Sequence, residues 1–152
     1  MTHQLAEPDL SLRLGVDAGA PRLARHHVRL VDSPSPDLRD AVVLLTSEIV
    51  ARAVEQGGAS ATGGALELWV WMPPDVVRVE LHGPSALAEV VPGLPPWHFD
   101  LMLLDSIADR WSLDAGAQGA CFWFEIDRRR DREPPIASET AATGERSPAL
   151  QR

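Results

Sequence analysis

A helical repeat between Leu38 and Gln56 constrains the fold of this chain more than any other feature. Apolar residues recur there at steps of three and four, the spacing of one face of an α-helix. The repeat consists of Leu38, Val42, Leu45, Ile49 and Ala53. A long helix with one apolar stripe needs a second layer to cover it. Gly57 and Gly58 follow the repeat and are predicted to end the helix, with a flexible loop over residues 57–64.

Several segments alternate apolar and polar residues, which predicts strands with one buried face. A sheet of these strands would form the second layer. The expected strands cover residues 10–16, 64–72, 76–82, 110–113 and 120–127. Two further helices are expected, a short one after the turn at Asp17–Pro21 and another over residues 99–109. A closing hairpin is expected around residues 114–119. This order predicts an α+β domain, a two-layer sandwich with a mixed or antiparallel sheet and helices on one face.

Composition divides the chain into one domain and two tails. Residues 1–9 are polar and aperiodic, so we expect a flexible N-terminal tail before a single domain over residues 10–127. Residues 128–152 have almost no large apolar side chains and hold six of the 14 Arg. This composition predicts a disordered, Arg-rich C-terminal tail.

The charge and the missing residue types exclude several classes of function. The net charge of −8 argues against nucleic acid as a partner, because phosphate binding requires a basic surface. The chain has no Lys and no Asn, which excludes Schiff-base chemistry and sites that depend on Asn. No apolar run approaches the roughly 18 residues of a membrane span. The single Cys121 predicts a reduced, cytoplasmic protein, and its alternation with Trp123 predicts that the thiol packs in the core.

Histidine and tryptophan residues are further candidates for a binding site. The five His show no metal-ligand spacing, and we expect no metal site. Trp69 and Trp71 fall on one strand face, which is either packed under the helices or exposed as a partner or dimer surface. Trp97 follows a Pro-rich stretch and is a candidate anchor for a protein partner.

Four segments resemble a known family in the expected order and spacing. Residues 46–57 (TSEIVARAVEQG) are similar to its N-box helix, and residues 78–85 (RVELHGPS) to a strand ending in an Asp-Pro-Ser-type turn. Residues 101–111 (LMLLDSIADRW) resemble the helix after its glycine pair, and residues 119–126 (GACFWFEI) its closing strand. The family is the anti-sigma-factor serine kinase type of histidine-kinase-like ATPases (GHKL), common among short regulators of actinobacteria. The resemblance implies the histidine-kinase-like ATPase fold for residues 10–127.

Family members of this type bind ATP and Mg²⁺, bind a sigma factor, and phosphorylate a small antagonist protein on Ser. The resemblance places Arg52 where an N-box Asn ligates Mg²⁺, although a guanidinium has no acceptor atom and repels the ion. It places Gly83, or His82 after a shift of one residue, where an Asp binds the adenine amino group. Both departures put nucleotide binding in doubt.

The other two positions of the implied nucleotide site are also informative. His98 and Asp100 match two glycines that let the backbone approach the phosphates, and Asp100 would bring negative charge toward them. Glu48 is retained and matches the Glu that acts as base in active members. Glu48 and Arg52 are four residues apart, so we expect an ion pair that fills the magnesium–phosphate space. A solvated surface pair, or an Arg52 that holds a phosphate directly, are the alternatives.

These departures favour a catalytically inactive regulator without a nucleotide cofactor that acts by binding another protein. The partner would be a sigma factor, an anti-sigma antagonist or a second copy of the chain. One alternative is an ATP- and Mg²⁺-dependent serine kinase with an altered site, which would use Glu48 as its base. Another is a small-ligand sensor that uses the emptied pocket between the long helices and residues 83–100.

Overall fold

The computed structural model describes residues 6–32, 35–59, 64–88 and 98–128, apart from the side chains of residues 57–59 and 98–101. Residues 60–63 of the loop expected over residues 57–64, together with Trp97 and most of both expected tails, therefore lie outside the described residues. Of the helices within these ranges, none has the length and apolar character that a membrane crossing requires.

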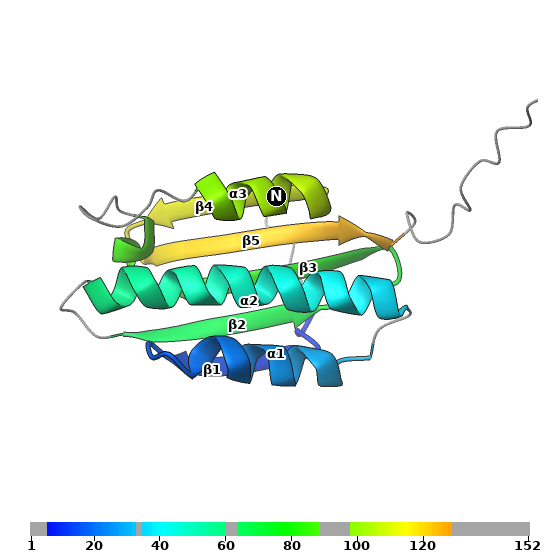
Figure 1. Ribbon diagram of the computed structural model, residues 1–152, viewed down its shortest axis with the longest axis horizontal. Helices are drawn as coiled ribbons and strands as arrows, with labels where there is room; N and C mark the ends of the chain where they lie inside the picture. Colours follow the sequence, from blue (N-terminus) through cyan, green and yellow to red (C-terminus); the bar gives the residue numbers. More distant parts are fainter. Residues whose placement is uncertain (1–5, 33–34, 60–63, 89–97, 129–152) are drawn as a thin grey trace, which may run out of the picture.

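Five antiparallel strands form one sheet in the order β1-β2-β3-β5-β4. The strands are β1 (Leu10–Gly15), β2 (Ala65–Trp71), β3 (Val76–Gly83), β4 (Arg110–Gly116) and β5 (Gly119–Asp127). The helices are α1 (Ala20–Leu30), α2 (Pro36–Ala59), α3 (His98–Ile107) and a short 3-10 helix, η1 (Ser85–Ala88). The α-helices lie over one face of the sheet (Figure 1). The α+β class and the two-layer arrangement expected from the sequence are thus confirmed, and the sheet is antiparallel.

The hydrophobic core lies between this face of the sheet and the helices. Alternate residues of β2, β3 and β5 supply its floor, and the apolar stripe of α2 covers it. The most deeply buried members include Val42, Leu45, Ile49, Leu66, Leu68, Val70, Val77, Val79, Leu81, Phe122 and Phe124. At about 25 cal/mol per Å² of apolar area removed from water, this burial is the main stabilising contribution. We call this side of the sheet the helix-covered face, and the opposite side the polar face.

Two element ends differ from the sequence prediction. Helix α2 does not end at Gly57 but continues through Gly58 to Ala59, because a glycine costs only about 1 kcal/mol within a helix and does not have to end one. The closing hairpin is tighter than expected, since β4 extends to Gly116 and β5 begins at Gly119. Backbone pairing therefore overrides the turn-like composition of residues 114–116.

The N-terminal segment before β1 is attached to the polar face. The indole Nε1 of Trp71 donates to the carbonyl oxygen of Ala6 at 2.6 Å, and the Met72 amide donates to Asp9 Oδ2 at 2.6 Å. Residues 6–9 thus cover the end of β2, and Trp71 is 7% exposed. This cover explains how a Trp on the face opposite the helices becomes buried.

Candidate functional site

Helix α2 carries the first two residues of the implied nucleotide site. Arg52 is 6% exposed, and its Nη1 lies 3.3 Å from Oε2 of Glu55. Glu48 is half-buried one turn earlier. The predicted Glu48–Arg52 ion pair is therefore wrong, since Arg52 pairs with Glu55. Residues three and four apart are both neighbours on a helix, so spacing alone did not decide between the two carboxylates.

Leu87 occupies the space beside Gly83. A Cβ atom added to Gly83 would lie 2.4 Å from Leu87 Cδ1 and 2.9 Å from Leu66 Cδ2. Both distances are shorter than van der Waals contact allows. Leu87 is 3% exposed, and its carbonyl oxygen accepts a hydrogen bond from Nε2 of the buried Gln56 at 3.3 Å. The position matched to an adenine-binding carboxylate is thus packed with leucine side chains, and η1 is fastened to α2 there.

The remaining predicted site residues do not join this group. His82 lies on the polar face, because Leu81 and Gly83 on either side of it face the helices. The side chain of His82 therefore points away from the helices, and the period-two alternation of β3 is the reason. His98 and Asp100 lie in the first turn of α3, and their side chains are outside the described residues.

An interlinked set of polar side chains covers the polar face of β3 and β5. Arg78 is at its centre: Nε donates to Glu80 Oε1 and Nη1 to Glu125 Oε1, both at 2.8 Å. The Arg78 guanidinium also lies 4.3 Å from the centre of the Trp123 ring, a cation–π contact. Arg110 on β4 donates to Glu125 Oε2 at 2.7 Å. Arginine suits this role, because its planar fork binds two carboxylates while it stacks on an aromatic ring.

Glu125 is the carboxylic acid of this network whose pKa differs most clearly from its ordinary value. Partial burial opposes its ionisation, but hydrogen bonds from Arg110 and Arg78 outweigh that effect and hold the pKa of Glu125 below its ordinary value. Glu125 is therefore ionised at neutral pH and binds the two arginines together.

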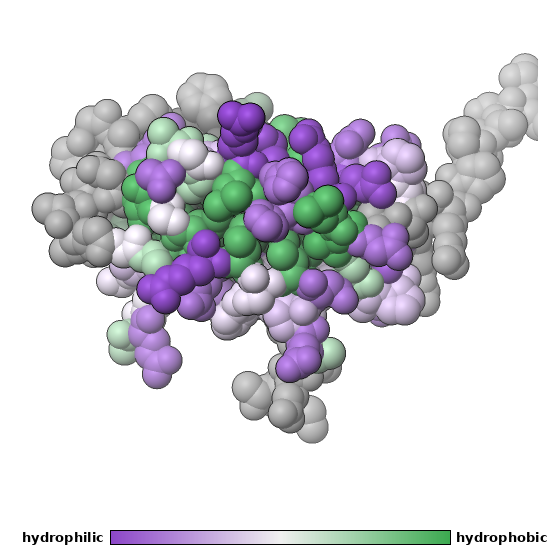
Figure 2. Space-filling model, turned by 90° about the horizontal axis from the view of Figure 1, so that it is seen from below, coloured by the Kyte–Doolittle hydropathy of each residue, from purple (hydrophilic) through white to green (hydrophobic). Residues whose placement is uncertain are grey.

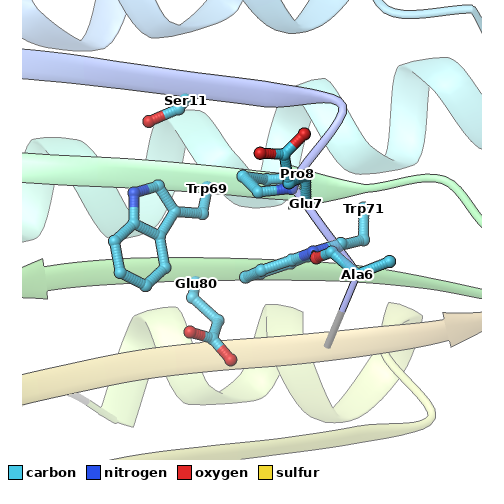
Figure 3. Close-up of a pocket in the computed structure, with 7 residues that line it drawn as sticks. All are labelled: Ala6, Glu7, Pro8, Ser11, Trp69, Trp71 and Glu80. Atoms are coloured by element: carbon cyan, nitrogen blue, oxygen red, sulfur yellow. The ribbon is translucent and has the colours of Figure 1, made fainter. Parts of the chain in front are cut away.

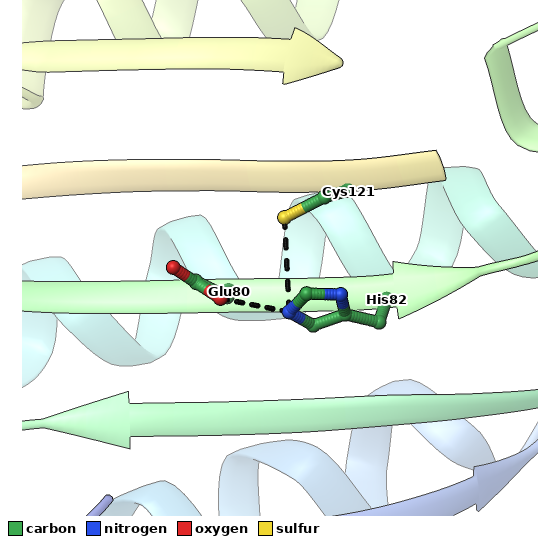
Figure 4. Close-up of side chains that lie close together, drawn as sticks. All are labelled: Glu80, His82 and Cys121. Carbon is green, nitrogen blue, oxygen red and sulfur yellow. Dashed lines mark hydrogen bonds and ion pairs between the residues drawn. The ribbon is translucent and has the colours of Figure 1, made fainter. Parts of the chain in front are cut away.

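Glu80, His82 and Cys121 form a compact cluster beside Arg78 (Figure 4). His82 Nε2 lies 2.7 Å from Glu80 Oε2 and 3.7 Å from the Cys121 sulfur. The ring of Trp69 packs against the imidazole, with 4.3 Å between ring centres. Cys121 thus lies on the polar face and not in the core, which corrects the sequence-based expectation. Burial is the main cause that raises the pKa of the Cys121 thiol to about 11, so the thiol is protonated at neutral pH.

Two hollows adjoin the cluster. The first, of about 620 Å³, is bordered by Trp69, Trp71 and Glu80 and by the attached N-terminal segment (Figure 3). The second, of about 390 Å³, lies beside His82 and Cys121 and reaches Asp114 and the β4–β5 turn. The cluster is therefore reachable by a small molecule or ion from either side.

The structure thus brings together a group that the sequence prediction missed. Glu80 and His82 two residues apart in a strand signalled a shared face, but nothing in the sequence indicated that Cys121 lies opposite His82. A carboxylate, an imidazole and a thiol at this spacing can share a proton or bind a metal ion. In comparisons with known proteins, the chain matches no protein-family model and no curated protein sequence.

Proposed function

We propose that the chain is a cytoplasmic regulatory domain of the anti-sigma kinase type of histidine-kinase-like ATPase, without nucleotide, that acts by binding another protein. The observation that carries the proposal is the packing around Gly83, where Leu87 occupies the position that an adenine-binding carboxylate needs. A nucleotide base in that place would have to displace a fully packed leucine and expose its apolar surface.

The surroundings of Arg52 support the same conclusion. A Mg²⁺ ion needs oxygen ligands, whereas the residue matched to its ligand is a buried guanidinium paired with Glu55. The antiparallel sheet with its α-helices on one face is also compatible with the two-layer fold that the resemblance implies. We therefore propose that the chain has the fold of the family but does not transfer a phosphoryl group.

The surface formed by α1 and the edge strand β1 is the proposed docking site for the partner. Seen from this side, the molecule carries apolar residues between hydrophilic ones (Figure 2). Leu23 and Leu30 of α1 are 43% and 71% exposed. In addition, β1 is at the edge of the sheet and pairs only with β2 among the described strands, which leaves backbone groups for a partner. We propose a sigma factor or an anti-sigma antagonist as that partner.

Titration calorimetry with ATP and Mg²⁺ tests the loss of nucleotide binding. The wild-type chain is expected to give no binding heat. Micromolar, Mg²⁺-dependent binding would instead support the rival function, a serine kinase in which Glu48 acts as base.

A designed restoration sharpens this test. Because an Asp at position 83 would collide with Leu87, the triple variant Arg52→Asn, Gly83→Asp, Leu87→Ala is expected to bind ATP better than Arg52→Asn, Gly83→Asp alone. If neither folded variant acquires any ATP binding, the assignment of these positions to the nucleotide site loses its support.

Capture of partners from the native cytosol tests the docking site. Leu30→Asp is expected to abolish capture of a specific protein, because it puts a charge into an apolar interface. Met102→Asp on α3 is the matched control, since Met102 is similarly exposed at 67% but lies on another helix. Equal loss with both variants would contradict the assignment of the docking site to α1.

A further inference from the structure

We propose that Glu80, His82 and Cys121 form a binding site for a divalent metal ion of the zinc type on the polar face of the sheet. The site is independent of the proposed docking surface, which lies around α1 and β1. It also departs from the sequence-based expectation that the chain has no metal site.

The geometry of the three ligand atoms carries the proposal. The Glu80 oxygen, His82 Nε2 and the Cys121 sulfur all lie within 4.8 Å of one another. A tetrahedral Zn²⁺ ion, with metal–ligand distances of about 2.0–2.3 Å, needs its ligand atoms roughly 3.3–3.6 Å apart. The present 3.7 Å between His82 Nε2 and the sulfur is about 0.1 Å longer than that spacing. The 2.7 Å between Nε2 and Glu80 Oε2 would have to lengthen by about 0.6 Å to reach it.

Neighbouring side chains hold two of the ligands in place. Arg78 donates to Oε1 of Glu80, which leaves Oε2 directed at the imidazole. Trp69 packs on the His82 ring and restricts its rotation. Such outer contacts orient ligands in metal sites. The two arginines of the network, Arg78 and Arg110, pair with three carboxylates, Glu80, Glu125 and Asp127, so the arginines do not cancel all of the negative charge beside the cluster.

The chemistry of the donor set selects the ion. Mg²⁺ and Ca²⁺ prefer oxygen ligands only, whereas thiolate, imidazole and carboxylate together are typical of Zn²⁺. Three protein ligands leave the fourth position open, and the hollow beside His82, Cys121 and Asp114 leads to it. A water molecule or a small ligand would complete the coordination from that side.

Metal binding requires a change in proton positions. The S–H bond of Cys121 breaks as the sulfur–metal bond forms, and that proton passes to solvent. The neutral imidazole binds through the lone pair of Nε2 and keeps its proton on Nδ1, instead of donating from Nε2 to Glu80. No oxidation or reduction is involved.

Cobalt substitution on the full chain, kept reduced with a phosphine, tests the site. Co²⁺ is expected to bind with one ion per chain and to give a thiolate-to-cobalt charge-transfer band together with the visible bands of four-coordinate cobalt. Zn²⁺ is expected to displace it. Cys121→Ser is expected to abolish the charge-transfer band. Loss of a residue that only orients a ligand typically weakens metal binding by about 10- to 100-fold. Because His82→Ala removes a ligand itself, it is expected to weaken Co²⁺ binding by more than that.

Exposed residues away from the cluster provide matched controls. His26→Ala on α1 and Asp40→Asn on α2 are expected to leave Co²⁺ binding unchanged, because both side chains are exposed and lie on helices. A wild-type spectrum without a thiolate band, or unchanged affinity in Cys121→Ser, would overturn the proposal.

A measurement on the wild-type chain avoids dependence on the folding of variants. Alkylation of Cys121 by iodoacetamide is followed with and without Zn²⁺. Coordination of the sulfur is expected to slow the reaction at least tenfold. An equal rate under both conditions would show that Zn²⁺ does not reach the sulfur and would overturn the site.

Discussion

The helix-covered face and the polar face of the sheet are formed by the same strands but have opposite chemical character. In β5, Phe122 and Phe124 are buried under the helices, whereas Cys121, Trp123 and Glu125 alternate with them on the polar face. One face gains its stability from apolar burial. The other is organised by arginine–carboxylate pairs and by aromatic rings.

This difference shows how a small sheet can support a core and a candidate site at the same time. Successive side chains of a strand point to opposite faces, so adjacent positions contribute to stability through different interactions. Substitution of neighbouring residues therefore separates the contribution of the core from that of the polar face.

The largest expected effect on the free energy of unfolding comes from removing a buried aromatic side chain of β5. Phe124 is 0% exposed, and Phe124→Ala is expected to lower the free energy of unfolding by about 3–5 kcal/mol. Trp123→Ala, one residue earlier, removes the contact with Arg78 and the hydrogen bond to Asp114, and is expected to cost only about 1–2 kcal/mol. Urea unfolding measures both. Equal losses would mean that the two faces do not differ in their contribution to stability.

A smaller effect is expected where β5 begins, at two glycines that pair across the closing hairpin. Gly119 has φ +127°, and an added Cβ would lie 2.4 Å from the Gly83 carbonyl oxygen, so Gly119→Ala is expected to cost about 1–3 kcal/mol. Gly116→Ala is the matched control, because a Cβ there meets nothing within 4 Å, and it is expected to change stability by less than about 0.5 kcal/mol. Thermal unfolding compares them, and a similar midpoint for both variants would contradict the close approach of Gly119 to the Gly83 carbonyl oxygen.

The smallest expected effect concerns the polar face and depends on pH. Because the pKa of Glu125 is below its ordinary value of 4.5 in the folded chain, its ionisation stabilises the fold above that value, and the contribution is lost as the pH falls through the lowered pKa. Glu125→Gln is expected to cost about 1 kcal/mol at pH 7. The difference from wild type should shrink when the pH is lowered from 7 to below 4.5.

Urea midpoints at both pH values check this prediction, with Glu67→Gln as the control. Glu67 is an exposed carboxylate on the neighbouring strand β2, and its loss is expected to have little effect. A difference between wild type and Glu125→Gln that stays constant with pH would contradict a role for the ionised carboxylate.

Much of the fold follows from local patterns. The stripe of α2 and the alternation of β2, β3 and β5 predicted the elements, the two layers and the buried residues, because these depend on neighbours close in the sequence. The end of α2 was missed, since Gly57 and Gly58 can remain helical. The partner of Arg52 was also missed, because Glu48 and Glu55 are both within reach on the same helix.

The candidate site was less predictable because it depends on contacts between distant residues. His82 and Cys121 are 39 residues apart, and they meet because β3 pairs with β5 in a register that places them directly opposite. Alternation indicates which face a residue occupies but not which strand lies beside it. For the same reason Cys121 was assigned to the core: the pattern of β5 has two faces, and only the packed helices distinguish them.

Local sequence patterns were enough to predict which residues alternate and where a long helix lies, and the composition shows that the chain has no Asn. The tertiary structure decided that Leu87 fills the space beside Gly83, and that Glu80, His82 and Cys121 come within reach of one another. The physical reason is that periodicity reports local geometry, whereas packing and strand register depend on how distant segments fit together.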